Sequence, residues 1–289
     1  MPTPRGLSAA QKLVIEYYKA KLNLMHVINA RWAAAAAIDL FQKPYASYRK
    51  KDPPIFKKAQ RSKLTSGAER LAVYHWKSHQ PNGQRLLLAH GFAGNCRSFD
   101  KYIGTALAKG YDVTTFDAPA HGKSTGQRLN LLSYSWALED VWKHHGPFDT
   151  CLAHSLGGMS LLLALERQES TVPRPRLVLI APLVEAWRAA DNFANFLQLP
   201  AALLQQMNDE ITRMAGHPLT HFSLPRLVAS YPQPVLWLHD RLDDTTPFAD
   251  VEPVQDNLPP HVQLLVTEGL GHSRIYRDNQ VRKTISEWL

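Results

Sequence analysis

Ser155 is the residue of this 289-residue chain that is best placed to act as a nucleophile. An apolar, strand-like run from Phe148 to Ala153 precedes it, and a helix-forming run from Leu161 to Arg167 follows. Ala153 and Gly157 are small, as a tight strand-to-helix turn requires. Such a turn exposes the serine Oγ at the sheet edge, where the helix N-terminus also directs its free N–H groups. Because serine among small residues is also an ordinary helix N-cap, this stretch alone does not decide its function.

A second group that could bind an anion lies in the turn His90-Gly91-Phe92-Ala93-Gly94-Asn95, directly after the strand-like run Arg85–Ala89. Ligands of an open parallel sheet bind outside the carboxyl ends of the strands, so this turn is expected near Ser155. Its glycines allow backbone angles that could direct the Phe92 N–H into the site. Together with the Leu156 N–H it would form a two-donor oxyanion hole. The alternative is a glycine-rich turn with no binding role.

Two later strand ends supply an imidazole and several carboxylates. The run Val262–Val266 leads to Glu268-Gly269-Leu270-Gly271-His272, where His272 lies on a glycine-flanked loop suited to a general base. The run Val235–Leu238 leads to His239-Asp240-Arg241-Leu242-Asp243-Asp244, and loop carboxylates are commonly just solvated. These residues alone do not choose among the three aspartates. The chain order Ser, Asp, His is the order of one hydrolase architecture.

The elements that must position these residues alternate along the chain. Apolar strand-like runs at 85–89, 112–116, 148–153, 177–181, 235–238 and 262–266 are separated by helical patterns at 98–109, 131–144, 156–168 and 275–289. This alternation predicts an α/β fold with a mostly parallel central sheet and helices on both faces. Two further strand patterns, 59–64 and 70–76, flank Thr65-Ser66-Gly67-Ala68 and predict a hairpin.

Two helical regions stand outside this alternation. The interval between Ala181 and Val235 is too long and too apolar for a simple crossover, and we interpret it as a helical cap over the strand ends. A capping box at Ser8 and Gln11 predicts a long amphipathic helix from about Ser8 toward Leu40, ended by Pro44. We expect its apolar residues to dock on the main domain and its basic face to point to solvent. The apolar residues expected to dock are Val14, Tyr18, Met25, Ile28 and Trp32.

Composition and charge narrow the class of protein. A chain with 45% hydrophobic residues is neither disordered nor fibrous. Two widely separated cysteines, Cys96 and Cys151, and the absence of a secretory apolar core at the N-terminus favour a soluble, cytoplasmic protein. Residues 1–63 hold 13 Lys/Arg against 3 Asp/Glu. We interpret this excess as a solvated face rather than a nucleic-acid site, with weak association to a membrane surface as the alternative. No clustered ligand spacing indicates a metal, and no cofactor is expected.

Residues from about 59 to 289 resemble the α/β-hydrolase superfamily, specifically its serine esterases and lipases. Four motifs carry the resemblance: His90-Gly91-Phe92, Phe116-Asp117-Ala118-Pro119-Ala120-His121-Gly122-Lys123-Ser124, Ala153-His154-Ser155-Leu156-Gly157 and Gly271-His272. Aligning His239 and Pro247 with the family's acid segment implies Asp243 as the acid. Ala153, Ala120 and Asp240 stand where the family has glycine, and Asp240 leaves the choice of acid open. His90, His121 and Asp117 are expected to tie turns together by hydrogen bonds.

The residue patterns together with the resemblance predict a domain division, and the resemblance implies a reaction. The division is 1–58 as an N-terminal helix and basic linker, 59–184 and 234–289 as the hydrolase core, and 185–233 as the helical cap. The reaction is ester hydrolysis through an acyl-enzyme: Ser155 attacks, His272 is the base, Asp243 orients it, and the Phe92 and Leu156 N–H groups bind the oxyanion. An apolar cap favours an apolar acyl or alcohol group of a small-molecule ester, contacted by Trp187, Phe193 and Phe196. His154 could face the pocket or simply fill its place in the turn. An acyltransferase, thioesterase or lactonase with the same residues, and a non-catalytic receptor, are the alternatives.

Overall fold

The chain forms two compact units. The computed structural model describes residues 8–45, 51–169 and 171–289. The larger unit comprises Pro44–Val184 and Ser223–Leu289, and the smaller one comprises Met1–Lys43 and Glu185–Phe222. Among the helices in the described ranges, none is long and apolar enough to cross a membrane.

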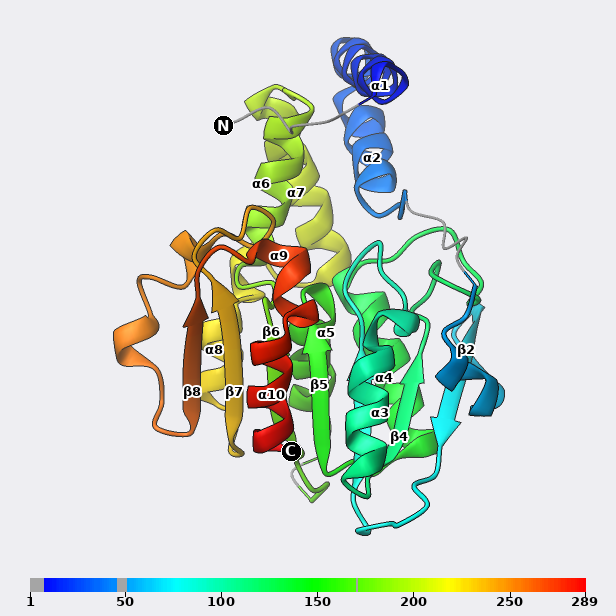
Figure 1. Cartoon of the computed structure of the whole chain (residues 1–289). Coiled ribbons are helices and arrows are strands. Elements are labelled where there is room, and N and C mark those ends of the chain that lie inside the picture. Colours follow the sequence, from blue (N-terminus) through cyan, green and yellow to red (C-terminus); the bar gives the residue numbers. More distant parts are fainter. Residues whose placement is uncertain (1–7, 46–50, 170) are drawn as a thin grey trace. The chain divides into compact units, whose positions relative to one another are not determined.

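The larger unit is built on an eight-stranded sheet in the order β1-β2-β4-β3-β5-β6-β7-β8 (Figure 1). β1 and β2 form the predicted antiparallel hairpin, β2 pairs antiparallel with β4, and all remaining pairs are parallel. The strands are β1 (Gln60–Ser66), β2 (Glu69–Trp76), β3 (Arg85–Ala89), β4 (Asp112–Phe116), β5 (Thr150–His154), β6 (Arg176–Ile180), β7 (Val235–Asp240) and β8 (Val262–Thr267). The predicted α/β fold with a mostly parallel sheet is confirmed.

Helices cover both faces of this sheet, as its continuous apolar strands require. In Figure 1, α3 and α10 lie in front of the sheet, and α4, α5 and α8 lie behind it. The helices are α3 (Asp100–Ala108), α4 (Leu131–His145), α5 (Leu156–Glu166), α8 (Leu224–Ala229), α9 (Gly271–Arg274) and α10 (Asn279–Trp288). Short 3₁₀ helices are η1 (Pro54–Lys58), η2 (Cys96–Phe99), η4 (Phe248–Asp250), η5 (Gln255–Asn257) and η6 (Ile275–Arg277). One core cluster joins the two helices in front of the sheet to β3. It contains Leu88 of β3, Phe99 and Ile103 at and in α3, and Val281 and Ile285 of α10.

The smaller unit contains α1 (Ala9–Ile28), α2 (Ala30–Phe41), α6 (Ala186–Phe196), α7 (Ala201–Ala215) and η3 (Leu219–His221). The expected single helix from Ser8 toward Leu40 is wrong at Asn29, whose backbone is extended at φ −156° and ψ 105°. The Asn29 N–H ends α1 by donating to the Met25 carbonyl, and its side chain begins α2 by accepting from the Trp32 N–H. Asparagine favours such a break because its side chain replaces lost backbone partners. The predicted capping box at Ser8 and Gln11 is present.

The packing of α1 differs from the sequence expectation. Leu22 is buried in a cluster with α2 and α7, and Ile15, Tyr18 and Met25 pack against that cluster. Val14, Ile28 and Trp32, which we expected to be buried with Tyr18 and Met25, are instead exposed. The helical period explains this difference, because α1 carries apolar residues on two sides and only the Leu22 side packs.

The bounds of the two units differ from the expected division of the chain. The N-terminal helices group with Glu185–Phe222 instead of forming a segment of their own with residues 44–58. Residues 223–233, expected in the cap, belong to the larger unit, where the backbone N–H of Leu224 donates to the Val184 carbonyl. The apolar interval after Ala181 is helical, as its pattern indicated, in α6, α7, η3 and α8.

Candidate active site

Ser155 occupies the tight turn between β5 and α5. Its backbone has φ 55° and ψ −128°, a strained region for a residue with a side chain. Neighbouring glycines make room for this turn. A Cβ on Gly91 would lie 2.8 Å from the Ser155 Cβ, and a Cβ on Gly157 would lie 2.6 Å from the His90 carbonyl oxygen. The serine is therefore held in an unusual conformation directly against the turn that follows β3.

His272 links Ser155 to Asp243. Its Nε2 lies 3.0 Å from the Ser155 Oγ, and its Nδ1 lies 2.8 Å from the Asp243 Oδ2. His272 comes from α9 after β8, and Asp243 from the loop after β7, so three separate strand ends meet here. An ionised carboxylate only accepts hydrogen bonds, so Nδ1–H donates to Asp243. That tautomer leaves Nε2 unprotonated and able to accept the Ser155 hydroxyl proton.

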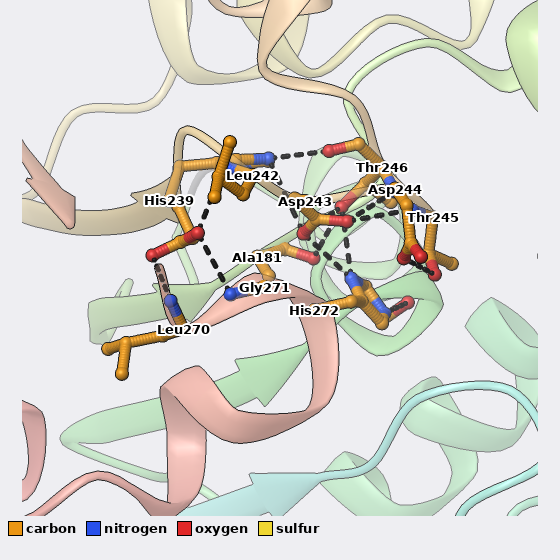
Figure 2. Close-up of polar contacts among 12 residues, drawn as sticks. Ala181, His239, Leu242, Asp243, Asp244, Thr245, Thr246, Leu270, Gly271 and His272 are labelled. Carbon is orange, nitrogen blue, oxygen red and sulfur yellow. Dashed lines mark hydrogen bonds and ion pairs between the residues drawn. The ribbon is translucent and has the colours of Figure 1, made fainter. Parts of the chain in front are cut away.

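The surroundings of Asp243 keep its carboxylate ionised (Figure 2). Oδ1 accepts from the Thr246 and Thr245 N–H groups at 2.8 and 2.9 Å, and Oδ2 accepts from the Thr246 hydroxyl at 2.9 Å. Burial by itself would raise the pKa of Asp243. The hydrogen bond and charge of His272, with the Thr246 and Thr245 N–H groups, outweigh burial and lower that pKa below its ordinary value.

The other two aspartates of the loop have different partners. Asp240, which is fully buried, accepts from Leu242 N at 3.0 Å and Gly271 N at 2.8 Å through Oδ1. Its Oδ2 accepts from Leu270 N at 3.0 Å and from the Thr267 hydroxyl at 2.7 Å. Asp240 thus joins the end of β7 to the loop that carries His272, and Figure 2 shows Leu270 and Gly271 in this network. Burial would raise its pKa, but these hydrogen bonds lower it.

Asp244 is exposed, and its side chain accepts only from its neighbour Thr245, at 3.2 Å, among the contacts within the described ranges. Of the three candidates, Asp243 is the one that contacts His272. This geometry agrees with the alignment of His239 and Pro247. Sequence reasoning did not predict that Asp240 joins two loops by hydrogen bonds. It also did not predict the contact of Thr246, whose hydroxyl donates to Asp243 and lies 3.2 Å from the His272 Nδ1.

The turn with Phe92 is fixed by buried histidines. The Ala93 N–H donates to the His121 Nε2 at 2.9 Å, and the Ala118 N–H donates to the His90 Nε2 at 3.0 Å. Both rings must be neutral to accept, and burial lowers the pKa of His90 to about 4. Asp117 accepts from the Cys96 and Lys123 N–H groups, so these three residues join turns as expected.

The N–H groups of Phe92 and Leu156 have no hydrogen-bond partner within the described residues. The Gly91–Ser155 and Gly157–His90 approaches place the two turns that carry these groups side by side. Both donors are thus available next to the Ser155 turn.

His154 is a buried residue whose ring packs against the rings of His272 and Tyr276. The ring centroids are 4.7 Å from that of His272 and 4.6 Å from that of Tyr276. The His154 Nε2 donates to the His272 carbonyl oxygen at 3.2 Å. Burial, followed by the charge of His272, lowers the pKa of His154 to about 3. Its ring also lies close to Gly91, where an added Cβ would come within 2.9 Å of the His154 Nδ1.

The three aromatic residues expected to contact substrate lie in the smaller unit. Phe193 packs against the core of that unit, with its ring centroid 5.1 Å from that of Phe41. Trp187 is half-buried, and the Arg188 Cζ lies over its ring, 4.2 Å from the ring centroid. Phe196 is exposed. Phe193 therefore has a packing role within its unit. In residues 8–45, 51–169 and 171–289, no group of three or more His, Cys, Asp or Glu side chains is arranged to hold a metal ion.

Comparison with solved structures identifies the fold. An esterase from Pyrococcus furiosus superposes with a TM-score of 0.63 at 18% identity, covering 86% of this chain and 96% of that one. The mouse alpha/beta hydrolase domain-containing protein 10 superposes with a TM-score of 0.60 at 17% identity, covering 80% of this chain and 96% of that one. Est1E from Butyrivibrio proteoclasticus, solved with ferulic acid bound, superposes with a TM-score of 0.60 at 16% identity, covering 78% of this chain and 97% of that one. At these identities the likeness establishes the α/β-hydrolase fold.

Comparison of sequences identifies the family. Mouse monoglyceride lipase is 29% identical over 134 residues, which are 43% of this chain and 43% of the lipase, so the chain spans less than half of that relative. Residues 80–233, more than half of the chain, match the sequence profile of the family described as "Serine aminopeptidase, S33". The match includes Ser155 and the turn around Phe92. The chain therefore belongs to this serine aminopeptidase family of α/β hydrolases.

Proposed function

We propose that this protein is a serine esterase that hydrolyses carboxylic esters through an acyl-enzyme intermediate. The observation that carries the proposal is the continuous line of hydrogen bonds from Ser155 through His272 to Asp243. A hydroxyl is a weak nucleophile at neutral pH, and a neutral imidazole at 3.0 Å is the base that activates it.

In the first half of the reaction, the Ser155 Oγ attacks the ester carbonyl carbon while its proton passes to the His272 Nε2. The carbonyl oxygen becomes an oxyanion that accepts hydrogen bonds from the Phe92 and Leu156 N–H groups. Asp243 stabilises the imidazolium that forms. When the C–O bond to the alcohol breaks, the leaving oxygen takes the proton from His272, and an ester of Ser155 remains.

In the second half, water attacks the acyl carbon and gives its proton to the His272 Nε2. The second oxyanion collapses, the bond to Oγ breaks, and Oγ recovers the proton from His272. The products are one alcohol and one carboxylic acid for each water consumed. All of these steps use groups of this chain at the carboxyl ends of four strands, β3, β5, β7 and β8.

Apolar esters are the substrate class that we propose. The relatives support it by their names, which include a monoglyceride lipase and an esterase. Trp187 and Phe196 stay proposed as substrate contacts. The family description favours one competitor, an aminopeptidase, which would use the same serine chemistry on an amide with an amine as leaving group.

The nucleophile is tested by labelling with a serine-directed fluorophosphonate followed by peptide mass spectrometry. We expect a single adduct on Ser155 that is lost in Ser155→Ala. A non-catalytic receptor would not react, and an adduct on another serine would refute the assignment of Ser155.

The substrate class is tested with p-nitrophenyl esters of increasing acyl length, an acyl thioester, a lactone and an aminoacyl p-nitroanilide. We expect the highest kcat/KM on an ester with an acyl chain longer than acetyl. Preference for the anilide would identify the aminopeptidase, preference for the thioester or lactone would identify those hydrolases, and ester formation from an added alcohol in excess of hydrolysis would identify an acyltransferase.

A further inference from the structure

One side of α1 is apolar and exposed along most of its length. Leu24 and Ile28 are 63% and 71% exposed, whereas Leu22 on the packed side is 1% exposed. The residues of this side recur at helical spacing and share one face of α1, which we name the outer stripe. Its members are Leu13, Val14, Tyr17, Leu24, Val27 and Ile28.

Six large apolar side chains exposed on one face of a helix are more than the single scattered ones that are normal on a soluble surface. Packing within the smaller unit does not need the stripe, because its core cluster is supplied by Leu22 from α1 and by residues of α2 and α7. The α1 helix therefore has two apolar sides, one packed within its own unit and one exposed.

The charge beside the stripe indicates what kind of partner it fits. Lys12 and Lys21 are exposed on α1, and the helix carries three lysines against one acid, Glu16. Residues 1–43 of the sequence, the N-terminal segment of the smaller unit, hold 6 Lys/Arg against 2 Asp/Glu. A second copy meeting this face would place like charges on like charges. An anionic surface complements them.

The side-chain types also suit a lipid surface. Tyr17 on α1 and Trp32 at the start of α2 are 58% and 67% exposed, and both types favour the headgroup level of a bilayer. Lysine stems can lie along apolar surface while the ammonium groups reach phosphate. A helix with an apolar face flanked by lysines lies in the plane of the interface.

We propose that α1 docks on anionic phospholipid membranes through the outer stripe, with Lys12 and Lys21 contacting lipid phosphates. This binding needs no transmembrane span. It is independent of the esterase proposal, because it uses none of the residues around Ser155.

The test is sedimentation of the full-length protein with vesicles of phosphatidylcholine containing phosphatidylglycerol, and with vesicles of phosphatidylcholine alone. The variant Leu24→Asp/Ile28→Asp places two carboxylates in the stripe. The matched control, Trp136→Asp/Met214→Asp, changes two side chains of similar exposure, 53% and 57%, on α4 and α7. Circular dichroism checks that each variant keeps its helical content.

We expect wild type and control to bind the anionic vesicles, with binding weakened as salt is raised, and the stripe variant to bind at least tenfold less. Removing two apolar contacts and adding two repelled charges accounts for that factor. Equal sedimentation of stripe variant and wild type would overturn the proposal, as would equal binding to uncharged vesicles. Failure to bind vesicles, combined with a wild-type dimer that dissociates in the stripe variant, would assign the stripe to a second copy instead.

Discussion

The His154 Nε2 donates a hydrogen bond of 3.2 Å to the carbonyl oxygen of His272, so the residue before the serine supports the loop that carries the imidazole. We predict that His154→Phe, which keeps the ring contacts but loses the donor, lowers kcat several-fold and leaves KM unchanged. The loss of one hydrogen bond corresponds to about 1 kcal/mol, or a factor of about five to ten. Steady-state kinetics on a p-nitrophenyl ester measures both. A raised KM with unchanged kcat would instead assign His154 to substrate binding.

Ser155→Ala should reduce ester turnover by several orders of magnitude without altering the fold, since it removes only Oγ. Ser160→Ala is the matched control, because Ser160 is also buried, on the helix that follows Ser155, and its hydroxyl makes only a long contact of 3.4 Å to the Leu131 carbonyl. It should keep nearly full activity. Retention of more than about a tenth of the activity in Ser155→Ala would place the nucleophile elsewhere.

The three aspartates of the β7 loop should separate on substitution by asparagine. Asp243→Asn should lower kcat by a factor on the order of 10³ or more, because the wrong imidazole tautomer is favoured. Asp240→Asn should cost stability and a smaller factor in kcat, because its amide cannot accept all four hydrogen bonds of the carboxylate. Asp244→Asn should change neither kcat nor the free energy of unfolding. Kinetics and urea unfolding of all three variants provide the comparison, and a larger kcat loss in Asp240→Asn would contradict the assignment of Asp243.

Stability should fall as the pH drops from about 6.5 toward 4. Burial holds the pKa of His154 at about 3 and that of His90 at about 4, below the ordinary histidine value. In this range the unfolded chain takes up protons that the folded chain does not, so the free energy of unfolding decreases by up to about 1.4 kcal/mol per pH unit for each histidine.

Urea unfolding at pH 7.5, 6.5, 5.5 and 4.5 measures this slope. His154→Phe should flatten it, and the exposed His144→Gln should leave it unchanged. An equal free energy of unfolding at all four pH values would contradict the buried neutral state of these rings.

Two leucines of α1 offer a matched pair for the packing of the smaller unit. Leu22→Ala should lower the free energy of unfolding by about 2–4 kcal/mol, because Leu22 is 1% exposed and truncation leaves a cavity. Leu24→Ala, at a position 63% exposed, should change it by less than about 0.5 kcal/mol. Denaturant unfolding followed by the helical signal tests both. Equal effects would mean that α1 does not pack as described.

The parts of the fold that sequence could predict are those set by local patterns. The strands Arg85–Ala89 and Asp112–Phe116 have the bounds that their residue patterns predicted, because a doubly covered sheet buries the four residues that follow the first in each strand. The Ser155 turn was predictable because only small residues fit beside it.

The parts that could not be predicted depend on distant contacts. Periodicity assigned Ile28 to the same apolar face as Tyr18 and Met25, and only the contacts of α1 with α2 and α7 decide which side of α1 is buried. Asp240 and Asp243 are likewise alike in sequence, and their roles differ because Gly271 reaches one and His272 the other. The break at Asn29 was visible in principle, since asparagine can cap a helix from either side.

The composition of the smaller unit from two distant segments has a consequence for synthesis on the ribosome. About 140 residues separate Lys43 from Glu185, so α1 and α2 emerge well before α7 exists. At a typical rate of translation this interval is roughly ten to thirty seconds. During that time Leu22 and the alanines of α2 lack their native partners on α7, and the nascent chain presents the apolar surface of these two helices to chaperones or to any nearby lipid surface.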